Sequence, residues 1–393
     1  MVEKMQYRNL GNTGEKVSIL GFGTMRLPHN KSNNEINEKE ASKILSYGID
    51  NGINIIDTGY SFHSSSLKGK GNCEPFIGEF LDTGYRSKIL LSAKLPSWQI
   101  KKREDMDKIF NDQLERLKTD YIDIYMLHGL TEDYWSNYKS LNVFEFLDNL
   151  LEEGKIKHVG FSAHVEFDTL MNILDDYDKW EVVLSQMNYL DENYKSGLAG
   201  LNLISSMGMG NIIMEPLRGG KLVQNIPKDI KDMWDSADVK RTPVEWALNY
   251  LWNMKNISCV FSGMNSLEQV KENIDIASNF KFNSISENDA FLIQEVAREY
   301  RFKRGNDCTS CQYCMPCPNG VNIPNCFKEY NVAKMLNNPK ASAMHYFNLI
   351  PEESRADKCN NCNKCLNFCP QLINIPEELE KVNNLFGNEF NYF

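Results

Sequence analysis

The run Ile122-Asp123-Ile124-Tyr125-Met126-Leu127-His128 is a short, mostly apolar stretch that ends on an ionisable residue. Its β-branched and aromatic content favours a buried strand. Similar runs recur over about the first 280 residues, and they alternate with segments that have the three- and four-residue apolar spacing of helices. The predicted strands are Val17–Gly23, Ile53–Asp57, Ile89–Lys94, Ile122–His128, Ile156–Phe161, Val182–Met187, Ile212–Glu215 and Cys259–Ser262.

This alternation predicts a parallel sheet, because parallel neighbours need a crossover between them. Eight such strands close into a (β/α)8 TIM barrel. The helical segments between them include Arg103–Leu117, Val143–Glu153 and Leu267–Ser278. An open doubly wound sheet is disfavoured, since Gly21–Gly23 lacks the third glycine and the helix of a dinucleotide-binding loop.

The overall composition excludes several classes of protein. The 393 residues carry 43 Lys and Arg against 53 Asp and Glu, a net charge of −10, so nucleic-acid binding is not expected. No apolar run reaches the roughly 18 residues of a membrane span, so we expect no membrane-spanning segment. The start, Met1–Met5, lacks the apolar core of a secretion signal. We therefore expect a cytoplasmic protein.

Nine of the eleven cysteines fall between Cys308 and Cys369, and eight of these form two runs that each end on Cys-Pro. The runs are Cys308-x2-Cys311-x2-Cys314-x2-Cys317-Pro318 and Cys359-x2-Cys362-x2-Cys365-x3-Cys369-Pro370. This spacing is typical of two [4Fe-4S] clusters, in which the fourth cysteine of one run serves the other cluster. Structural zinc is disfavoured, because it uses pairs of cysteines and has no role for a third evenly spaced thiolate.

The two predicted ligand sets follow from that exchange of the fourth cysteine. One set is Cys308, Cys311, Cys314 and Cys369, and the other is Cys359, Cys362, Cys365 and Cys317. The remaining cysteines, Cys73, Cys259 and Cys326, are expected to be small buried side chains. Clusters of this kind indicate an oxygen-sensitive protein of an anaerobic cell.

The chain is thus expected to have three parts. Residues 1–283 form the barrel, residues 284–304 form a connecting helix, and residues 305–393 form a small, mainly α-helical dicluster domain. Helical patterns such as Cys326–Leu336 lie between the two cysteine runs, so the last part resembles the α-helical type of dicluster ferredoxin rather than the compact bacterial type.

Three ionisable residues end successive predicted strands: Asp57, Lys94 and His128. In a (β/α)8 barrel the catalytic residues lie at the carboxyl ends of the strands. Each residue alone could be a solvated or capping group. Together they predict a polar site at the mouth of the barrel.

At these residues the chain resembles the aldo-keto reductases over about residues 5–280, and with the cysteine runs it resembles the branch fused to an iron–sulfur domain. The matching motifs are Tyr7–Gly11 with Gly21–Met25, Asp57-Thr58, Lys94, Asp123–His128, Gly154–Ile156 before Gly160–Ser162, and Gln186. The resemblance implies hydride transfer from a nicotinamide to a carbonyl carbon, with a proton delivered to the oxygen.

The resemblance also implies roles for the residues at the mouth. Asp57 and Lys94 would form a buried ion pair, and His128 would orient the substrate. Where the family has its proton-donating tyrosine, this chain has Phe62, whose ring carries no transferable proton. Tyr60 and His63 are the nearby candidates for a replacement, and the polar loop 64–72 that follows leaves the choice open.

The nucleotide site is likewise implied by resemblance. Its expected residues are Ser162 and Gln186 on the nicotinamide side, and Ser262, Gly263, Met264, Asn265, Glu272 and Asn273 on the pyrophosphate and adenosine side. A glycine-flanked loop entering the helix near Leu267 offers N–H groups to phosphate, although such a loop is also an ordinary turn. Neither NAD(H) nor NADP(H) is selected.

Two functions compete at this stage. The first is an NAD(P)H-linked oxidoreductase that acts on a small carbonyl or related substrate, with two clusters that transfer electrons to the barrel or to a redox partner protein. The second is a nucleotide-binding electron carrier or sensor whose barrel has lost carbonyl reduction with its tyrosine. A flavin would join two-electron and one-electron chemistry, but the sequence has no flavin signature. It also indicates no oligomeric state.

Overall fold

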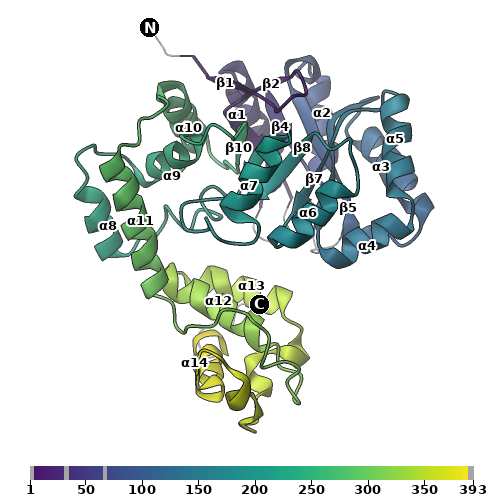
Figure 1. Ribbon diagram of the computed structural model, residues 1–393. Helices are drawn as coiled ribbons and strands as arrows, with labels where there is room; N and C mark the ends of the chain where they lie inside the picture. The colour runs from purple at the N-terminus through teal and green to yellow at the C-terminus, as the bar shows by residue number, and fades with distance from the viewer. Residues whose placement is uncertain (1–3, 31–34, 65–68, 388–393) are drawn as a thin grey trace. The chain divides into compact units, whose positions relative to one another are not determined.

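The computed structural model describes residues 4–30, 35–64 and 69–387 (Figure 1). The chain divides into two compact units. The first contains residues 1–219 and 244–285, and the second contains residues 220–243 and 286–393. Residues 220–243, which we assigned to the barrel, therefore fall in the second unit. The domain boundaries at residues 283 and 304 stay predictions.

The first unit contains a closed, eight-stranded parallel barrel, as predicted. Its strands pair in chain order, and the last closes on the first through Val260 beside Leu20. The strands are β3 (Leu20–Gly23), β4 (Ile55–Asp57), β5 (Leu90–Pro96), β6 (Ile122–Leu130), β7 (Ile156–Ala163), β8 (Val182–Gln186), β9 (Gly210–Met214) and β10 (Cys259–Ser262).

The predicted strand Val17–Gly23 is wrong in one respect, because the structure divides it in two. β2 (Lys16–Ser18) pairs antiparallel with β1 (Tyr7–Asn9), and only β3 joins the barrel. The break is stabilised by the Ser18 hydroxyl, which donates to the Leu20 carbonyl at 2.7 Å. Val17 is fully buried in the same apolar cluster as the barrel-lining residues, which explains why the run reads as one strand.

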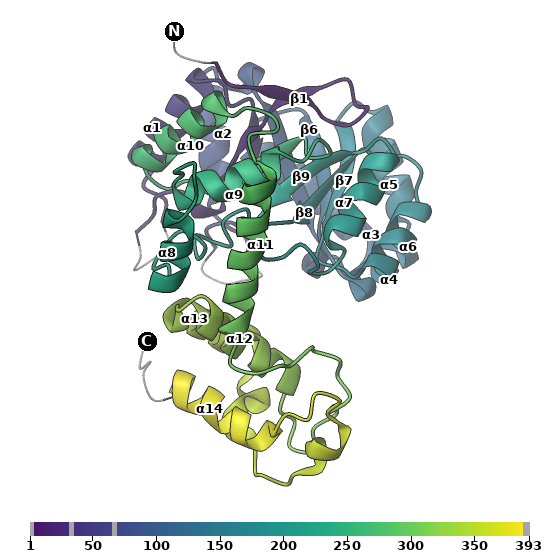
Figure 2. The ribbon, with the colours of Figure 1, turned by 60° about the vertical axis from the view of Figure 1, so that its left-hand side comes forward.

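Helices surround the barrel (Figures 1 and 2), and each has buried apolar side chains. In α5, for example, Val143, Phe146, Leu147 and Leu150 are buried at helical spacing. The helices predicted at 103–117, 143–153 and 267–278 are confirmed to within one residue at each end. The helices are α1 (Glu38–Asp50), α2 (Cys73–Asp82), α3 (Arg103–Arg116), α4 (Glu132–Ser140), α5 (Val143–Glu152), α6 (Phe167–Asp175), α7 (Gly197–Ser206), α9 (Pro243–Trp252) and α10 (Leu267–Asn279), with 3-10 turns η1 (Thr24–Arg26), η2 (Arg86–Lys88) and η3 (Ser97–Gln99).

The regular elements of the second unit's described residues are all helices or 3-10 turns, as we expected for the cysteine-containing part. Its α11 starts at a capping box, in which Ser286 and Asp289 satisfy each other's backbone N–H groups. An apolar cluster joins the later helices around Phe327, Tyr346 and Phe386. The elements are α8 (Lys228–Asp235), α11 (Glu287–Phe302), α12 (Ile323–Met335), α13 (Pro339–Leu349) and α14 (Ile375–Gly387), with turns η4 (Glu352–Ser354), η5 (Ala356–Lys358) and η6 (Lys364–Phe368).

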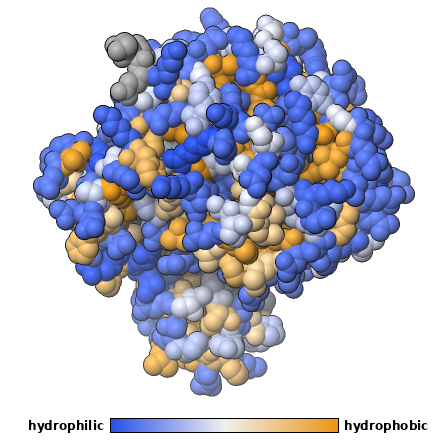
Figure 3. Space-filling model, turned by 45° about the horizontal axis from the view of Figure 1, so that its top comes forward, coloured by the Kyte–Doolittle hydropathy of each residue, from blue (hydrophilic) through white to orange (hydrophobic). Residues whose placement is uncertain are grey.

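The surface has a mixed character. On the face shown in Figure 3, hydrophilic residues predominate and apolar ones are scattered among them. None of the helices formed by residues 4–30, 35–64 and 69–387 has both the length and the apolar content of a membrane span.

Candidate functional site

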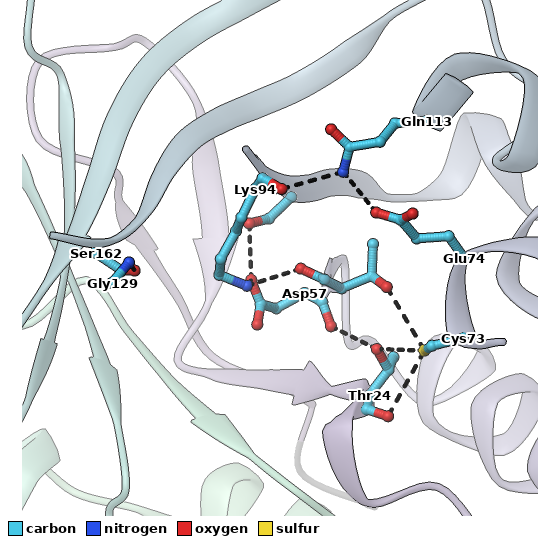
Figure 4. A network of polar contacts seen from close by, with 10 residues as sticks. Thr24, Asp57, Cys73, Glu74, Lys94, Gln113, Gly129 and Ser162 are labelled. Atoms are coloured by element: carbon cyan, nitrogen blue, oxygen red, sulfur yellow. Dashed lines mark hydrogen bonds and ion pairs between the residues drawn. The ribbon is translucent and has the colours of Figure 1, made fainter. Parts of the chain in front are cut away.

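A buried ion pair lies at the mouth of the barrel (Figure 4). Asp57 ends β4, and Lys94 on the neighbouring strand β5 places its ammonium against the Asp57 carboxylate. The Lys94 ammonium also donates to the Thr58 carbonyl at 2.8 Å, and the Ser92 hydroxyl donates to Asp57 at 2.9 Å. Lys94 is 1% exposed and Asp57 6%. Both charges are therefore solvated by protein groups instead of water.

Burial and pairing act on Asp57 in opposite directions. Burial raises the pKa of the Asp57 carboxyl, whereas Lys94 and the Ser92 hydroxyl oppose that rise. Removing either partner would leave the other charge buried without compensation, which costs more than an exposed charge would. The pair is thus a firmly held charge site below the barrel mouth.

Phe62 covers this pair. The Lys94 ammonium lies 5.2 Å from the centre of the Phe62 ring, a cation–π contact. The same ring meets His128 edge-to-face, with 6.1 Å between ring centres. Phe62 therefore occupies the space between lysine and histidine. A hydroxyl on its ring is the one group that this arrangement lacks.

His128 is neutral at physiological pH. Burial lowers its pKa well below the usual value, and the charge of Lys94 and nearby His164 lower it further. The ring packs against Trp98 with 4.9 Å between ring centres. Its Nδ1 is shielded from solvent and has no hydrogen-bond partner among the residues that the structure describes. A neutral imidazole both donates and accepts, so His128 can bind an oxygen of a ligand.

Two candidates for the missing proton donor lie elsewhere. The Tyr60 ring stacks under the guanidinium of Arg116 at 5.0 Å, and burial raises the pKa of its hydroxyl. No hydrogen bond within the described part of the chain joins this hydroxyl to Asp57, Lys94 or His128. The His63 ring approaches the Thr24 carbonyl at 3.2 Å instead. Residues 65–68 of the loop lie outside the described residues.

A second buried network, which sequence reasoning missed, supports the strand that carries Lys94 (Figure 4). Gln113 of α3 donates both to the Lys94 carbonyl at 3.1 Å and to the Glu74 carboxylate at 2.6 Å. Arg116 pairs with Glu74 at 2.8 Å. Burial outweighs this attraction and raises the pKa of Glu74 to about 7. The available signal was a glutamate among the apolar inward-facing residues of α2.

The predicted nicotinamide-side residues lie on adjacent strands, Ser162 on β7 and Gln186 on β8. The Ser162 hydroxyl accepts from the Gly129 N–H at 2.8 Å. The Gln186 amide donates to Asp191 at 2.9 Å, and Arg218 pairs with the same carboxylate at 3.2 Å. Both predicted side chains are therefore held in defined positions at the carboxyl ends of their strands.

The predicted pyrophosphate and adenosine side has a different character. Buried Asn273 of α10 donates to the Ser262 hydroxyl at 2.8 Å, which ties the helix to the end of β10. Met264 is 1% exposed, so its side chain belongs to the core and leaves only backbone for a ligand.

Three further predicted residues surround this tie. Gly263 lies beside the stem of Arg26, where a Cβ would come within 3.1 Å of that side chain. Asn265 and Glu272 are exposed. Burial and nearby Glu245 raise the pKa of Glu272. Gly263, Asn265 and Glu272 thus lie at the surface around the end of β10, and the nucleotide site stays a prediction.

The first predicted cysteine set surrounds one cavity in the second unit. Cys308, Cys311, Cys314 and Cys369 all line it. Its apolar lining comes from α12 and from the start of α14 with the residue Ile373 before it, namely Ile323, Pro324, Phe327, Ile373 and Ile375. Over the described residues, no three His, Cys, Asp or Glu side chains converge tightly enough to hold a single ion.

The second set is grouped by its mutual electrostatics. Burial raises the pKa of the Cys365 thiol, and Cys359, Cys317 and Cys362 raise it further because they are close. The Cys308 thiol shows the matching pattern with Cys311 and Cys369. Cys317 therefore lies near Cys365 of the other run and Cys369 near Cys308, while the assignment of the eight cysteines to two clusters stays a prediction.

The three other cysteines are fully buried structural side chains. Cys73 starts α2 and bonds to the Thr24 hydroxyl at 3.1 Å, Cys259 lies in β10, and Cys326 lies in α12. Burial raises the pKa of Cys73 to about 11 and that of Cys326 to about 12. Such thiols are unreactive at physiological pH.

Comparison with known proteins gives two family matches, one over the barrel and one over the cysteine-containing part. Residues 19–293 match the aldo/keto reductase family, and residues 307–375 match a 4Fe-4S dicluster domain. The solved structure of the aldo-keto reductase AKR11C1 from Bacillus halodurans (holo form) is similar, with a TM-score of 0.62 and 25% identity over 74% of this chain and 96% of that chain.

Individual relatives are similar at low identity. Protein tas of Escherichia coli (strain K12) is 25% identical over 325 residues, 69% of this chain and 92% of that protein. L-galactose dehydrogenase of Arabidopsis thaliana is 28% identical over 294 residues, 69% and 88%. The NADH-specific methylglyoxal reductase of Escherichia coli (strain K12) is 25% identical over 333 residues, 73% and 97%.

Proposed function

Because the chain belongs to the aldo/keto reductase family and carries a 4Fe-4S dicluster domain, we propose that its barrel reduces a small carbonyl compound with NADH or NADPH. The observation that carries this proposal is the buried Asp57–Lys94 pair beside neutral His128. A barrel that only held a nucleotide would have no need to bury two charges at its mouth, since burying them is costly.

The proposed roles rest on the resemblance to the aldo/keto reductase family. A bound nicotinamide supplies the hydride. Ser162 and Gln186 hold its carboxamide, and the backbone from Ser262 to Asn265, with Glu272 and Asn273, faces the phosphates and adenosine. His128 donates a hydrogen bond to the carbonyl oxygen and so polarises the carbonyl group. Relatives named for methylglyoxal and L-galactose support small oxo compounds and sugars as the substrate class.

Proton delivery is where this chain departs from its family. We keep Tyr60 as the proposed donor, with His63 as the other candidate, and either side chain would have to leave the contacts described above. Without a positioned acid, reduction proceeds more slowly, since such a group contributes about 10²–10⁴-fold. Lys94 then stabilises negative charge that develops near Phe62.

We further propose that the two cysteine sets each hold one [4Fe-4S] cluster. One is bound by Cys308, Cys311, Cys314 and Cys369, and the other by Cys359, Cys362, Cys365 and Cys317. The clusters transfer single electrons to or from the barrel or a redox partner protein. About eight irons per chain in anaerobically purified protein are expected. Four irons, or zinc in their place, would contradict this assignment.

The replacement of tyrosine by Phe62 favours a second function, a nucleotide-binding electron carrier or sensor. Anaerobic stopped-flow measurements separate the two. The protein is mixed with NADH or NADPH and a panel of aldehydes, ketones and enones, and nicotinamide oxidation is followed at 340 nm. Turnover with at least one acceptor is expected. Tight nucleotide binding without oxidation by any acceptor would establish the carrier or sensor function instead.

A further inference from the structure

Two polar ring nitrogens at the barrel mouth are buried without a partner. They are Nε1 of Trp98 and Nδ1 of His128, and neither has a hydrogen bond to any part of the chain that the structure describes. Their rings are 4.9 Å apart, tilted by 55°. A buried polar group without a hydrogen bond costs about 1–3 kcal/mol. Two such groups side by side indicate a site that is completed by a ligand.

The backbone holds the rings of Trp98 and His128 next to each other. Trp98 lies in η3, directly after the strand that carries Lys94, and His128 lies opposite Pro96 on the next strand. The Ser97 hydroxyl donates to the His128 carbonyl at 2.6 Å and fastens the turn to that strand. The indole N–H is therefore positioned by regular structure and does not depend on a loose loop.

Two neighbours of His128 among the described residues, Phe62 and Lys94, supply no partner. Phe62 meets His128 with an apolar edge, and Lys94 points its ammonium at Asp57 and the Thr58 carbonyl. The indole nitrogen is only a donor, so its ligand must present an acceptor. In the proposed function His128 already donates a hydrogen bond to the oxygen of the reacting carbonyl. The indole N–H of Trp98 therefore needs a second acceptor atom on the ligand.

We propose that Trp98 is a substrate-binding residue, and that Trp98 and His128 together bind two neighbouring oxygens of an α-oxygenated carbonyl compound. This proposal rests on the proposed carbonyl reduction. His128 binds the carbonyl oxygen, and the indole N–H of Trp98 donates to the hydroxyl or keto oxygen on the adjacent carbon. A simple ketone of the same size leaves the indole N–H unpaired and is disfavoured.

The test compares hydroxyacetone with 2-butanone, which differ only in a hydroxyl against a methyl group. Trp98→Phe keeps an aromatic ring and removes the N–H. It is expected to lower kcat/KM for hydroxyacetone at least tenfold and to change that for 2-butanone less than twofold. The matched control is Trp135→Phe on α4, which removes an indole N–H that donates to Asp176. It is expected to leave kcat/KM unchanged for both ketones. Equal losses for both ketones, or none, would overturn the proposal.

A binding measurement separates this proposal from the proposed function. In protein labelled with 15N-tryptophan, the indole N–H signal absent from Trp98→Phe belongs to Trp98. Hydroxyacetone is expected to shift that signal, and 2-butanone is not. The shift stands even if neither ketone is reduced, in which case only the proposed reduction fails. If wild-type protein reduces hydroxyacetone but the signal does not move, the role of Trp98 is wrong and the reduction stands.

Discussion

The barrel mouth and the cysteine runs both gather reactive side chains, but the protein holds them in opposite ways. Lys94 is 1% exposed and tied to Asp57 and Thr58 by direct bonds. Cys311 and Cys362 are exposed, and the other cluster cysteines are partly exposed. The first site is formed by the fold itself. The second lies in loops, and we expect bound iron–sulfur clusters to hold these loops in place, as is usual where metal binding and folding are coupled.

Different interactions consequently stabilise the two regions. The barrel site is supported by a continuous network from Asp57 through Lys94 to Gln113 and Glu74. The cysteine loops pack on a small apolar cluster around Phe327 and Tyr346, with thiols at its edge. Perturbing the clusters should therefore loosen the loops, whereas perturbing the barrel mouth should cost folding energy.

The largest expected effect is on the cysteine loops when iron is removed. Chelation under reducing conditions should make amide hydrogen exchange fast over residues 308–317 and 359–369 and leave the barrel strands protected. Mass spectrometry of exchanged peptides measures this. By iron analysis, Cys311→Ser and Cys365→Ser should each lose about half of the iron, while the control Cys326→Ala retains it all. Barrel strands that lose protection with the loops would break the comparison.

The next effect is on the buried ion pair. Lys94→Met should destabilise the protein by about 3–5 kcal/mol, because it leaves the Asp57 carboxylate buried without its partner. Urea denaturation followed by circular dichroism measures the change. Lys139→Met is the control, since it removes a lysine 41% exposed from its pair with Asp176. An equal cost for both variants would mean that burial at the mouth is unimportant.

Replacing Phe62 tests whether the barrel mouth, unlike the cysteine loops, is already arranged for its chemistry, because the right replacement should raise the rate of carbonyl reduction. Phe62→Tyr places a hydroxyl beside Lys94 and His128, and carbonyl reduction should rise about 100-fold, as expected for a positioned acid. Steady-state kinetics with NADH or NADPH and methylglyoxal measure it. Phe62→Leu, which removes the ring without adding a hydroxyl, should show no gain. If the tyrosine variant is no faster, the mouth is not arranged for acid catalysis.

The smallest effect concerns the pH dependence of stability. Burial raises the pKa of Glu74 to about 7 from 4.5, so between these values the folded state holds a proton that the unfolded state has lost. Stability should therefore fall as pH rises through this window. Glu74→Gln should flatten the dependence by about 1–3 kcal/mol between pH 5 and 8.

Denaturation at both pH values tests this prediction for Glu74. Glu79→Gln is the matched control, because its carboxylate is 68% exposed and pairs only with Lys118 at the surface. Wild-type and Glu74→Gln curves that run parallel between the two pH values would show that Glu74 does not titrate in this window.

Much of this architecture could be predicted from residue patterns alone. Eight apolar runs separated by helical patterns favour a closed parallel barrel, because this number of strands closes the sheet on itself and the chain lacks the dinucleotide-binding loop of an open doubly wound sheet. Cysteine spacing is even more direct, because a cluster constrains the chain through covalent ligands that are close in sequence. Strand ends were less certain: Lys94 and His128 lie two residues inside β5 and β6, which continue to Pro96 and Leu130.

Other features depended on contacts between residues far apart in sequence. The sequence by itself determined the fold class, the two cysteine runs and the absence of a tyrosine at position 62, because each rests on local spacing or residue identity. Only the tertiary structure decided that Phe62 lies between Lys94 and His128, that Tyr60 turns toward Arg116, and that Trp98 joins the mouth. Those outcomes depend on how loops fold back over the strand ends, and such packing leaves no periodic signal in the chain.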